Sequence, residues 1–329
     1  MNTLLEVNDL EVKFKSSQQE LKALKNISFS VKKGETVCIV GESGSGKSIT
    51  SLSLMRLLPR NGQISNGSIK FKENDIVQET EKTLEKIRGK EISMIFQEPM
   101  TALNPTFTVG YQLKEPLVTH QRLSKSEAKK KSIIMLEKVG IPNPKEKLNV
   151  YPHELSGGMR QRIMIAMALS CEPSLLIADE PTTALDVTIQ AQILNLIEEL
   201  KQQMEMGIVF VTHDMGVVAE IADRVVVMYA GEIIENGDVK NVFNNPSHPY
   251  TQKLLASVPA IDKEQPVEGI PGSMPSLEDH ISGCQFHTRC PFAMEKCTHK
   301  SPPFFDISST HESKCWLLEV KNKNEQTST

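Results

Sequence analysis

Residues 36–48 read TVCIVGESGSGKS and join a short apolar run to a loop of glycine and serine. The run at 36–40 predicts a buried strand, and residues 47–58, which stop before a proline, predict a helix. Between them, residues 41–48 match the pattern G-x-x-x-x-G-K-[ST] in the strand–loop–helix context that the pattern requires. Because such a loop surrounds phosphate oxygens with backbone N–H groups at a helix N-terminus, the stretch predicts a nucleotide-phosphate site in an α/β fold.

The same pattern gives roles to individual side chains. Lys47 is placed to reach the β- and γ-phosphates, and Ser48 is placed to ligate Mg²⁺. A plain flexible loop is the alternative interpretation, whereas a dinucleotide-binding loop is excluded because Ile49 stands where its third glycine is required. The other loop residues expected to contact phosphate are Gly41, Ser43, Gly44, Ser45 and Gly46.

A second motif is the apolar run LLIADE at residues 175–180, which ends in two acids. Asp179 is placed to hold Mg²⁺ beside Ser48, and Glu180 is placed to polarise a water for attack on the γ-phosphate. An acidic turn after a strand is common, so the motif is weak alone. Behind a phosphate loop it predicts hydrolysis of a nucleoside triphosphate.

Strand and helix patterns alternate through the rest of the chain, which predicts a parallel α/β sheet. Residues 98–158 are mainly helical, and their clearest helix, at 126–139, has Ser124 or Ser126 as its cap. Beyond about residue 245 the chain becomes proline-rich and loop-like. Strands are predicted at 4–14, 23–31, 92–96, 175–178, 208–212 and 225–228, and helices at 158–170, 188–205 and after Asp214.

The third motif, LSGGMRQR at residues 155–162, closely resembles the signature motif of ATP-binding-cassette (ABC) ATPases. A generic serine-capped helix start is the alternative, but it does not explain why the motif lies just before the strand at 175–178. Three further features follow in the family's order. Gln97 and His213 end strands, as the Q-loop glutamine and the switch histidine do, and ALD at 184–186 resembles the D-loop. On these motifs the chain is identified as a member of the ABC ATPases.

This resemblance implies a P-loop NTPase cassette with a RecA-like core, an antiparallel β subdomain and a helical signature subdomain. It implies that Glu180, His213 and Gln97 are catalytic, with Gln97 also at the Mg²⁺ site. Phe14 stands where the family has the aromatic residue that stacks on adenine, and a buried strand residue is the alternative. The other residues assigned to ATP binding are Ser156, Gly157, Gly158 and Asp186.

A narrower resemblance points to the ATP-binding subunits of oligopeptide, dipeptide and nickel importers. QEPMTALNP at 97–105, NPSHPYT at 245–251 and the cysteine-containing tail are similar to theirs. The resemblance implies an ATPase domain at 1–255 with its helical subdomain at about 98–160, and a small C-terminal tail at 256–320. Residues 321–329 are polar and are expected to be disordered.

In this family two different ATP-binding subunits usually pair beneath two membrane permeases that an external solute-binding protein supplies. The resemblance therefore implies ATP-driven uptake of peptides, with nickel or another small solute as the alternative. A soluble ABC ATPase is disfavoured, because such proteins carry two cassettes or a long coiled coil. An exporter ATPase does not explain the cysteine tail. The cargo itself is set by the binding protein and the permeases.

Composition agrees with a peripheral subunit. The chain has 329 residues and a net charge of −4, which argues against nucleic acid as a partner. It has neither an apolar stretch long enough to span a membrane nor a signal-peptide core. These features predict a cytoplasmic chain, and the resemblance to importer subunits implies a location at the cytoplasmic face of the cell membrane.

The six cysteines are of two kinds. Cys38 and Cys171 lie in apolar contexts and are expected in the core. Four others lie in the tail with the spacing C-x5-C-x6-C-x17-C, and four thiolates suit either a tetrahedral zinc or a [4Fe-4S] cluster. The resemblance to importer tails implies the cluster, and the alternative is a set of unliganded cysteines. These residues are Cys284, Cys290, Cys297 and Cys315.

Overall fold

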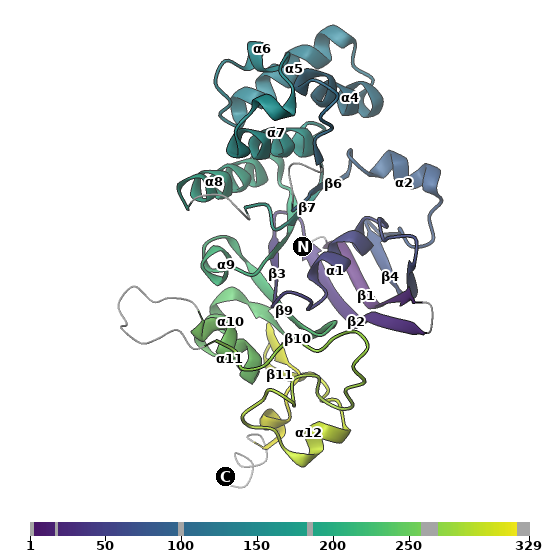
Figure 1. The fold of residues 1–329 in the computed structure, drawn as a ribbon, viewed down its shortest axis with the longest axis vertical. Coiled ribbons are helices and arrows are strands. Elements are labelled where there is room, and N and C mark those ends of the chain that lie inside the picture. The colour runs from purple at the N-terminus through teal and green to yellow at the C-terminus, as the bar shows by residue number, and fades with distance from the viewer. Residues whose placement is uncertain (1–2, 17–18, 98–101, 183–186, 258–268, 321–329) are drawn as a thin grey trace. The chain divides into compact units, whose positions relative to one another are not determined.

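The computed structural model describes residues 3–16, 19–97, 102–182, 187–257 and 269–320. The chain divides into two compact units (Figure 1). The first comprises residues 1–4, 31–35 and 71–210, and the second comprises residues 5–30, 36–70 and 211–329. The description below takes each unit by itself.

The first unit carries a parallel strand pair and most of the helices. Strand β6 (Ile92–Ile95) lies parallel to β7 (Leu175–Asp179), with Ile92 opposite Leu175. All of their residues are buried, and all but Ser93 and Asp179 are apolar, as a strand covered on both faces requires. The other elements are β5 (Asn74–Asp75), α2 (Glu81–Ile87), α4 (Val109–Gln121), α5 (Lys125–Lys138), α6 (Pro144–Lys147), the 3₁₀ helix η1 (Pro152–Glu154), α7 (Gly157–Leu169) and α8 (Val187–Met204).

Helices α4, α5 and α7 contact one another and form a helical group in this unit (Figure 1). Helix α5 begins at Ser124, whose hydroxyl accepts the Glu127 N–H while the Glu127 carboxylate accepts the Ser124 N–H. This capping box settles the choice between Ser124 and Ser126. The expected helical insertion is therefore confirmed, and Cys171 packs beside it against Leu117 and Ala128.

The second unit contains two groups of strands. In the first group β1 (Thr3–Lys15) lies between β2 (Glu20–Lys32) and β4 (Gly62–Phe71). The second group follows the order β11-β12-β10-β9-β3, in which β3 (Thr36–Val40) runs parallel to β9 (Arg224–Tyr229). Strand β8 (Gly207–Thr212) lies where the chain passes from the first unit to the second. The helices are α1 (Lys47–Leu54), α9 (Met215–Ile221), α10 (Val239–Asn244), α11 (Pro249–Ala256) and α12 (Glu295–His299).

The C-terminal segment is more ordered than its composition indicates. Strand β10 (Glu232–Asp238) pairs antiparallel with β12 (His311–Ser313), and β12 pairs with β11 (Phe305–Ser308). The expectation of a loop-like texture beyond residue 245 is therefore wrong for β11 and β12 and for helices α11 (Pro249–Ala256) and α12 (Glu295–His299). The short strand β12 gains regular structure from pairing with β10, which a local pattern does not reveal.

The strands and helices predicted around the three motifs are confirmed within a few residues at each end. Helix α1 ends at Leu54 instead of residue 58, because Arg56 adopts a left-handed conformation. Cys38 and Cys171 are buried, as expected. Among the described residues no helix is both long and apolar enough to cross a membrane.

Candidate functional site

The loop between β3 and α1 is built for close approach of a ligand to the backbone. Gly46 caps α1 with a φ of 106°, in the left-handed region that favours glycine. At Gly41 a Cβ atom would come within 2.3 Å of the Met228 carbonyl oxygen, so a side chain cannot be accommodated there. The loop is thus held by glycine at both ends and opens onto the N-terminus of a helix.

Lys47 is buried at the mouth of this loop. Its Nζ donates to the carbonyl oxygens of Gly41 at 2.7 Å and Glu42 at 2.9 Å. The Ser45 hydroxyl is buried and has no hydrogen-bond partner in the structure, and Ser48 is exposed at the start of α1. A cationic side chain, an unsatisfied hydroxyl and a helix N-terminus in one loop fit a bound phosphate chain.

The acidic motif lies in the first unit. Asp179 is buried at the end of β7, and Glu180 follows it in a left-handed conformation with a φ of 46°. The Gln97 side chain, at the end of β6, donates from Nε2 to Glu180 Oε2 at 3.1 Å. The structure therefore brings together Gln97 and Glu180, as the strand order predicts.

The signature motif begins helix α7 on an exposed surface of the same unit. Ser156 is the N-cap, and its hydroxyl accepts the Met159 N–H at 3.3 Å. No atom lies within 4 Å of the position that a Cβ of Gly157 would take, and at Gly158 the nearest is Ile189, at 3.5 Å. Open space before a helix N-terminus fits an anion presented by another molecule.

Three other predicted site residues are His213, Phe14 and Asp186. His213 follows β8 in the second unit and is exposed, just before Asp214, which caps α9. Phe14 is half-buried near the end of β1, and a Cβ at Gly62 would come within 2.7 Å of its ring. Asp186 lies outside the described residues.

Sequence reasoning missed the residues that hold Glu42 in the phosphate loop. The Glu42 N–H donates to the Tyr250 hydroxyl at 2.7 Å, and the Glu42 carboxylate accepts two hydrogen bonds from Arg289. Tyr250 lies in the stretch at 245–251 that resembles importer subunits, but nothing local in that stretch indicates contact with residue 42. Tyr250 and Arg289, with Tyr229 and Phe286 packed against them, come together only in the folded second unit.

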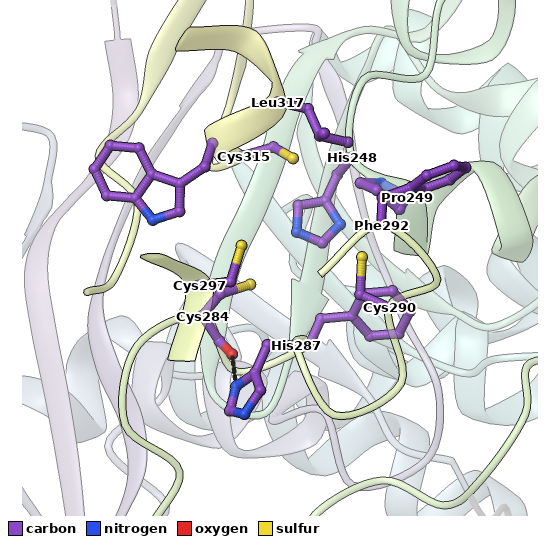
Figure 2. Close-up of a pocket in the computed structure, with 11 residues that line it drawn as sticks. His248, Pro249, Cys284, His287, Cys290, Phe292, Cys297, Cys315 and Leu317 are labelled. Carbon is purple, nitrogen blue, oxygen red and sulfur yellow. Dashed lines mark hydrogen bonds between the residues drawn. The ribbon is translucent and has the colours of Figure 1, made fainter. Parts of the chain in front are cut away.

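The four tail cysteines line one cavity, together with His248 and His287 (Figure 2). Burial raises the pKa of the Cys284 thiol to about 12 and that of Cys315 to about 11. Burial also raises the pKa of Cys290. Without a metal the thiols of these three cysteines are therefore protonated at neutral pH.

Neither the predicted [4Fe-4S] site nor its zinc alternative is supported by the described part of the structure. Among the residues that the structure describes, no group of three or more histidines, cysteines, aspartates and glutamates is placed to hold a metal ion. The four thiols approach their cavity from separate parts of the tail: Cys297 lies in α12, and Cys315 follows β12. They line one cavity, but no metal-holding group is found among the described residues, so the cluster and zinc expectations both lack support from the geometry.

Two family models match the chain. The model described as ABC transporter matches residues 24–183, and the model described as oligopeptide/dipeptide transporter, C-terminal region, matches residues 234–297. The second match includes three of the four tail cysteines. The two matches together include the phosphate loop and the tail as far as Cys297.

Curated relatives are similar over almost the whole chain. Identity is 52% over 318 residues to the oligopeptide transport ATP-binding protein OppD of Bacillus subtilis (strain 168), covering 96% of this chain and 89% of that protein. Identity is 49% over 320 residues to the dipeptide transport ATP-binding protein DppD of Lactococcus lactis subsp. cremoris (strain MG1363), covering 97% and 92%.

Solved structures share the fold of the cassette. The dimeric ATP-binding cassette MJ0796 in a post-hydrolysis state with ADP and Pi has a TM-score of 0.65 and 28% identity, covering 72% of this chain and 99% of that one. CbiO1 from Clostridium perfringens, part of the complex CbiONQ, has a TM-score of 0.64 and 30% identity, covering 74% and 92%.

Proposed function

The chain belongs to the ABC transporter family of ATPases, and from this membership we propose that it is the subunit that binds and hydrolyses ATP to power peptide import. The observation that carries the proposal is the similarity to peptide-transport ATP-binding proteins at about half of all positions over almost the full chain. The match of residues 234–297 to a C-terminal region found in oligopeptide and dipeptide transporters supports the same cargo class.

The phosphate loop supplies the binding half of the chemistry. Lys47, held by two loop carbonyls, exchanges those contacts for the β- and γ-phosphate oxygens of ATP, and the loop N–H groups bind the remaining oxygens. Ser48, Asp179 and Gln97 would hold Mg²⁺, which would supply positive charge to neutralise the phosphate chain. Phe14 stacks on the adenine ring.

Glu180 acts in the hydrolysis of the bound ATP. As the general base it accepts a proton from the attacking water, while the Gln97 amide fixes its carboxylate through the hydrogen bond at 3.1 Å. His213 contacts the γ-phosphate from the end of β8, and Asp186 is assigned to the ATP site through its match to the D-loop. These assignments rest on the match of each residue to a family motif.

A second ATP-binding subunit completes the site. Ser156 and Gly157 are exposed in their own chain and Gly158 follows them half-buried, which fits a role of the motif on a partner's nucleotide. The similar cassette MJ0796 is described as a dimer with ADP and Pi. The pair is expected to consist of this chain and a paralogue, beneath two permeases at the cytoplasmic face of the membrane and supplied by a solute-binding protein.

The test is peptide uptake by the native host after deletion of the gene. Uptake of labelled di- and oligopeptides should be lost on deletion and restored by the wild-type chain. Lys47→Ala should not restore it, whereas Lys33→Ala, at an exposed lysine of the first unit, should restore it. Loss of nickel uptake with intact peptide uptake would favour the nickel alternative over the peptide function.

The tail cysteines are proposed to hold one [4Fe-4S] cluster. In such a cluster each thiolate binds a different iron, so the four sulfurs surround a cavity without converging on one point. The four thiols line one cavity, and the pattern of the importer tails supports the identity of the group. The cluster would staple a tail that has few large apolar residues.

Anaerobic purification tests the cluster. The wild-type chain should be brown and contain about four irons per chain. Cys297→Ser should lose the iron, whereas Cys171→Ser, at a buried cysteine outside the cavity, should retain it. Stoichiometric zinc without iron, or no metal at all, would refute the cluster and leave the ATPase function untouched.

A further inference from the structure

The phosphate loop of the second unit contains an acidic residue whose charge is fully engaged by the cysteine tail. The Arg289 guanidinium donates from Nη1 to Glu42 Oε2 at 2.8 Å and from Nη2 to Glu42 Oε1 at 3.1 Å. The pair is bidentate, and the Arg289 side chain is only 4% exposed. Such a pair has the fork geometry of the stronger charge-assisted hydrogen bonds.

Arg289 is held on its other sides as well. Its Nε donates to the Pro271 carbonyl oxygen at 2.7 Å, and Nη2 donates to the Ile270 carbonyl oxygen at 3.2 Å. The guanidinium lies 5.8 Å from the centroid of the Tyr229 ring and 6.0 Å from that of Phe286. A guanidinium fixed by this many groups presents one geometry to Glu42.

Glu42 is in turn fixed within the loop. Its N–H donates to the Tyr250 hydroxyl, and its carbonyl oxygen accepts from Lys47 Nζ at 2.9 Å and from the Ser45 N–H at 3.2 Å. The side chain and the backbone of one residue therefore connect the tail to the lysine that is expected to reach phosphate. A shift of Glu42 would move the carbonyl that holds Lys47.

The charge of Glu42 works against the function of the loop. A carboxylate in a loop that receives a triphosphate repels the ligand, and the repulsion grows with each added phosphate charge. Pairing with Arg289 cancels this charge at a partly buried position, where water screens it incompletely. The loop thus needs a counter-charge, and the tail supplies it.

We propose that Arg289 is a positioning residue of the ATP site, which neutralises Glu42 and fixes the phosphate loop, so that the cysteine tail is a working part of that site. The proposal rests on the proposed function only in that residues 41–48 bind ATP. It assigns to the tail a role that does not depend on whether its cysteines hold a metal.

The test compares the binding of ATP, ADP, AMP and adenosine to the full-length chain and its variants by calorimetry. Arg289→Gln should weaken ATP binding roughly tenfold or more, ADP binding less, and adenosine binding hardly at all. Glu42→Gln combined with Arg289→Gln should recover most of the ATP affinity, because the uncompensated carboxylate is gone. Arg289→Lys, which keeps the charge without the fork, should lie between the wild type and Arg289→Gln.

The matched control is Lys296→Gln. Lys296 forms an ion pair with Glu319 at 2.5 Å and lies 3.5 Å from the centroid of the Trp316 ring, all within the tail. This variant removes a comparable tail interaction without touching residues 41–48, so its ATP affinity should match that of the wild type. Thermal unfolding of Arg289→Gln and Lys296→Gln measures whether either substitution destabilises the chain.

Three results would overturn the proposal. They are ATP affinity of Arg289→Gln equal to that of the wild type, equal losses for ATP and adenosine, and no recovery in the double variant. The last two would indicate a purely structural role for the pair. Failure of the wild-type chain to bind ATP would instead overturn the proposed function, so the two failures are distinguishable.

Discussion

The amide of Gln97 donates a hydrogen bond to the carboxylate of Glu180 at 3.1 Å, although the two residues are 83 positions apart. Their strands, β6 and β7, are parallel neighbours, so both side chains emerge at the same edge of the first unit. Glu180 adopts a left-handed φ of 46°, which an acidic residue holds only at a cost of about 1 kcal/mol or more. An acid held in this conformation and fixed by an amide is suited to work as a positioned base.

Glu180→Gln should therefore leave ATP binding intact and lower hydrolysis in the assembled transporter by about 100-fold or more, because the amide keeps the shape but cannot accept the proton. The measurement is steady-state ATPase activity with a parallel binding assay. Glu172→Gln is the matched control, since Glu172 also has a positive φ, of 57°, and lies in the same unit. Hydrolysis by Glu180→Gln near the wild-type rate would remove Glu180 from the mechanism.

Ser156→Ala should lower turnover only where a partner subunit is present. The isolated chain should be a poor ATPase, because its signature motif has no phosphate of its own to contact. Ser156→Ala and Ser124→Ala each remove an N-cap, and each should cost about 1 kcal/mol of stability. The assembled transporter should lose ATPase activity with Ser156→Ala alone. Full turnover by a demonstrated monomer of this chain would contradict the shared site.

Much of the fold and the ATP site can be predicted from the sequence because the decisive signals are local. A continuous apolar run, a glycine loop and a capped helix lie within residues 36–54, and the predicted strand matches β3 residue for residue. Helix α5 likewise has a capping box within its own sequence, which marks where it begins. In each case the residues that form the structure are neighbours in the chain.

The tail could not be predicted in the same way, because its structure depends on distant partners. Strand β12 is three residues long and forms by pairing with β10. Arg289 is 247 positions from Glu42, and no periodicity links an arginine beside a cysteine to a loop near the N-terminus. The metal expectation rested on the cysteine spacing and on the resemblance to importer tails, and neither determines whether four thiols are placed to hold a metal.

Stability of the chain purified without metal should fall as the pH is lowered from about 6.5 to about 4. Burial lowers the pKa of His248 to about 4, and the nearby Glu235 carboxylate opposes this only in part. The unfolded chain binds the proton first, so the free energy of unfolding is fully retained above pH 6.5 and is lost below it, by up to about 3 kcal/mol. Denaturant unfolding at several pH values measures the effect.

The control for this pH dependence is His248→Asn. His248 caps α11 through Nδ1, which accepts the Tyr250 N–H at 3.0 Å, and asparagine is also a good N-cap but does not titrate. The variant should therefore have a shallower slope between pH 6.5 and 4. His311 and Glu235 form a buried hydrogen-bonded pair nearby, and both are present in the wild type and in His248→Asn. An unchanged slope would assign the pH dependence to other groups.

Gly157→Ala should separate folding from function. The added methyl group meets no atom within 4 Å, and alanine is a better helix former than glycine, so stability should be unchanged or higher by up to about 1 kcal/mol. The methyl group nevertheless points into the open space where the partner's nucleotide is expected, so ATPase activity of the assembled transporter should fall.

Gly41→Ala is the contrasting variant. Its added Cβ would lie 2.3 Å from the Met228 carbonyl oxygen, so the substitution should destabilise the chain itself. Thermal unfolding and ATPase assays are measured on both variants. A stable Gly157→Ala chain with full transporter activity would show that the signature loop does not contact nucleotide.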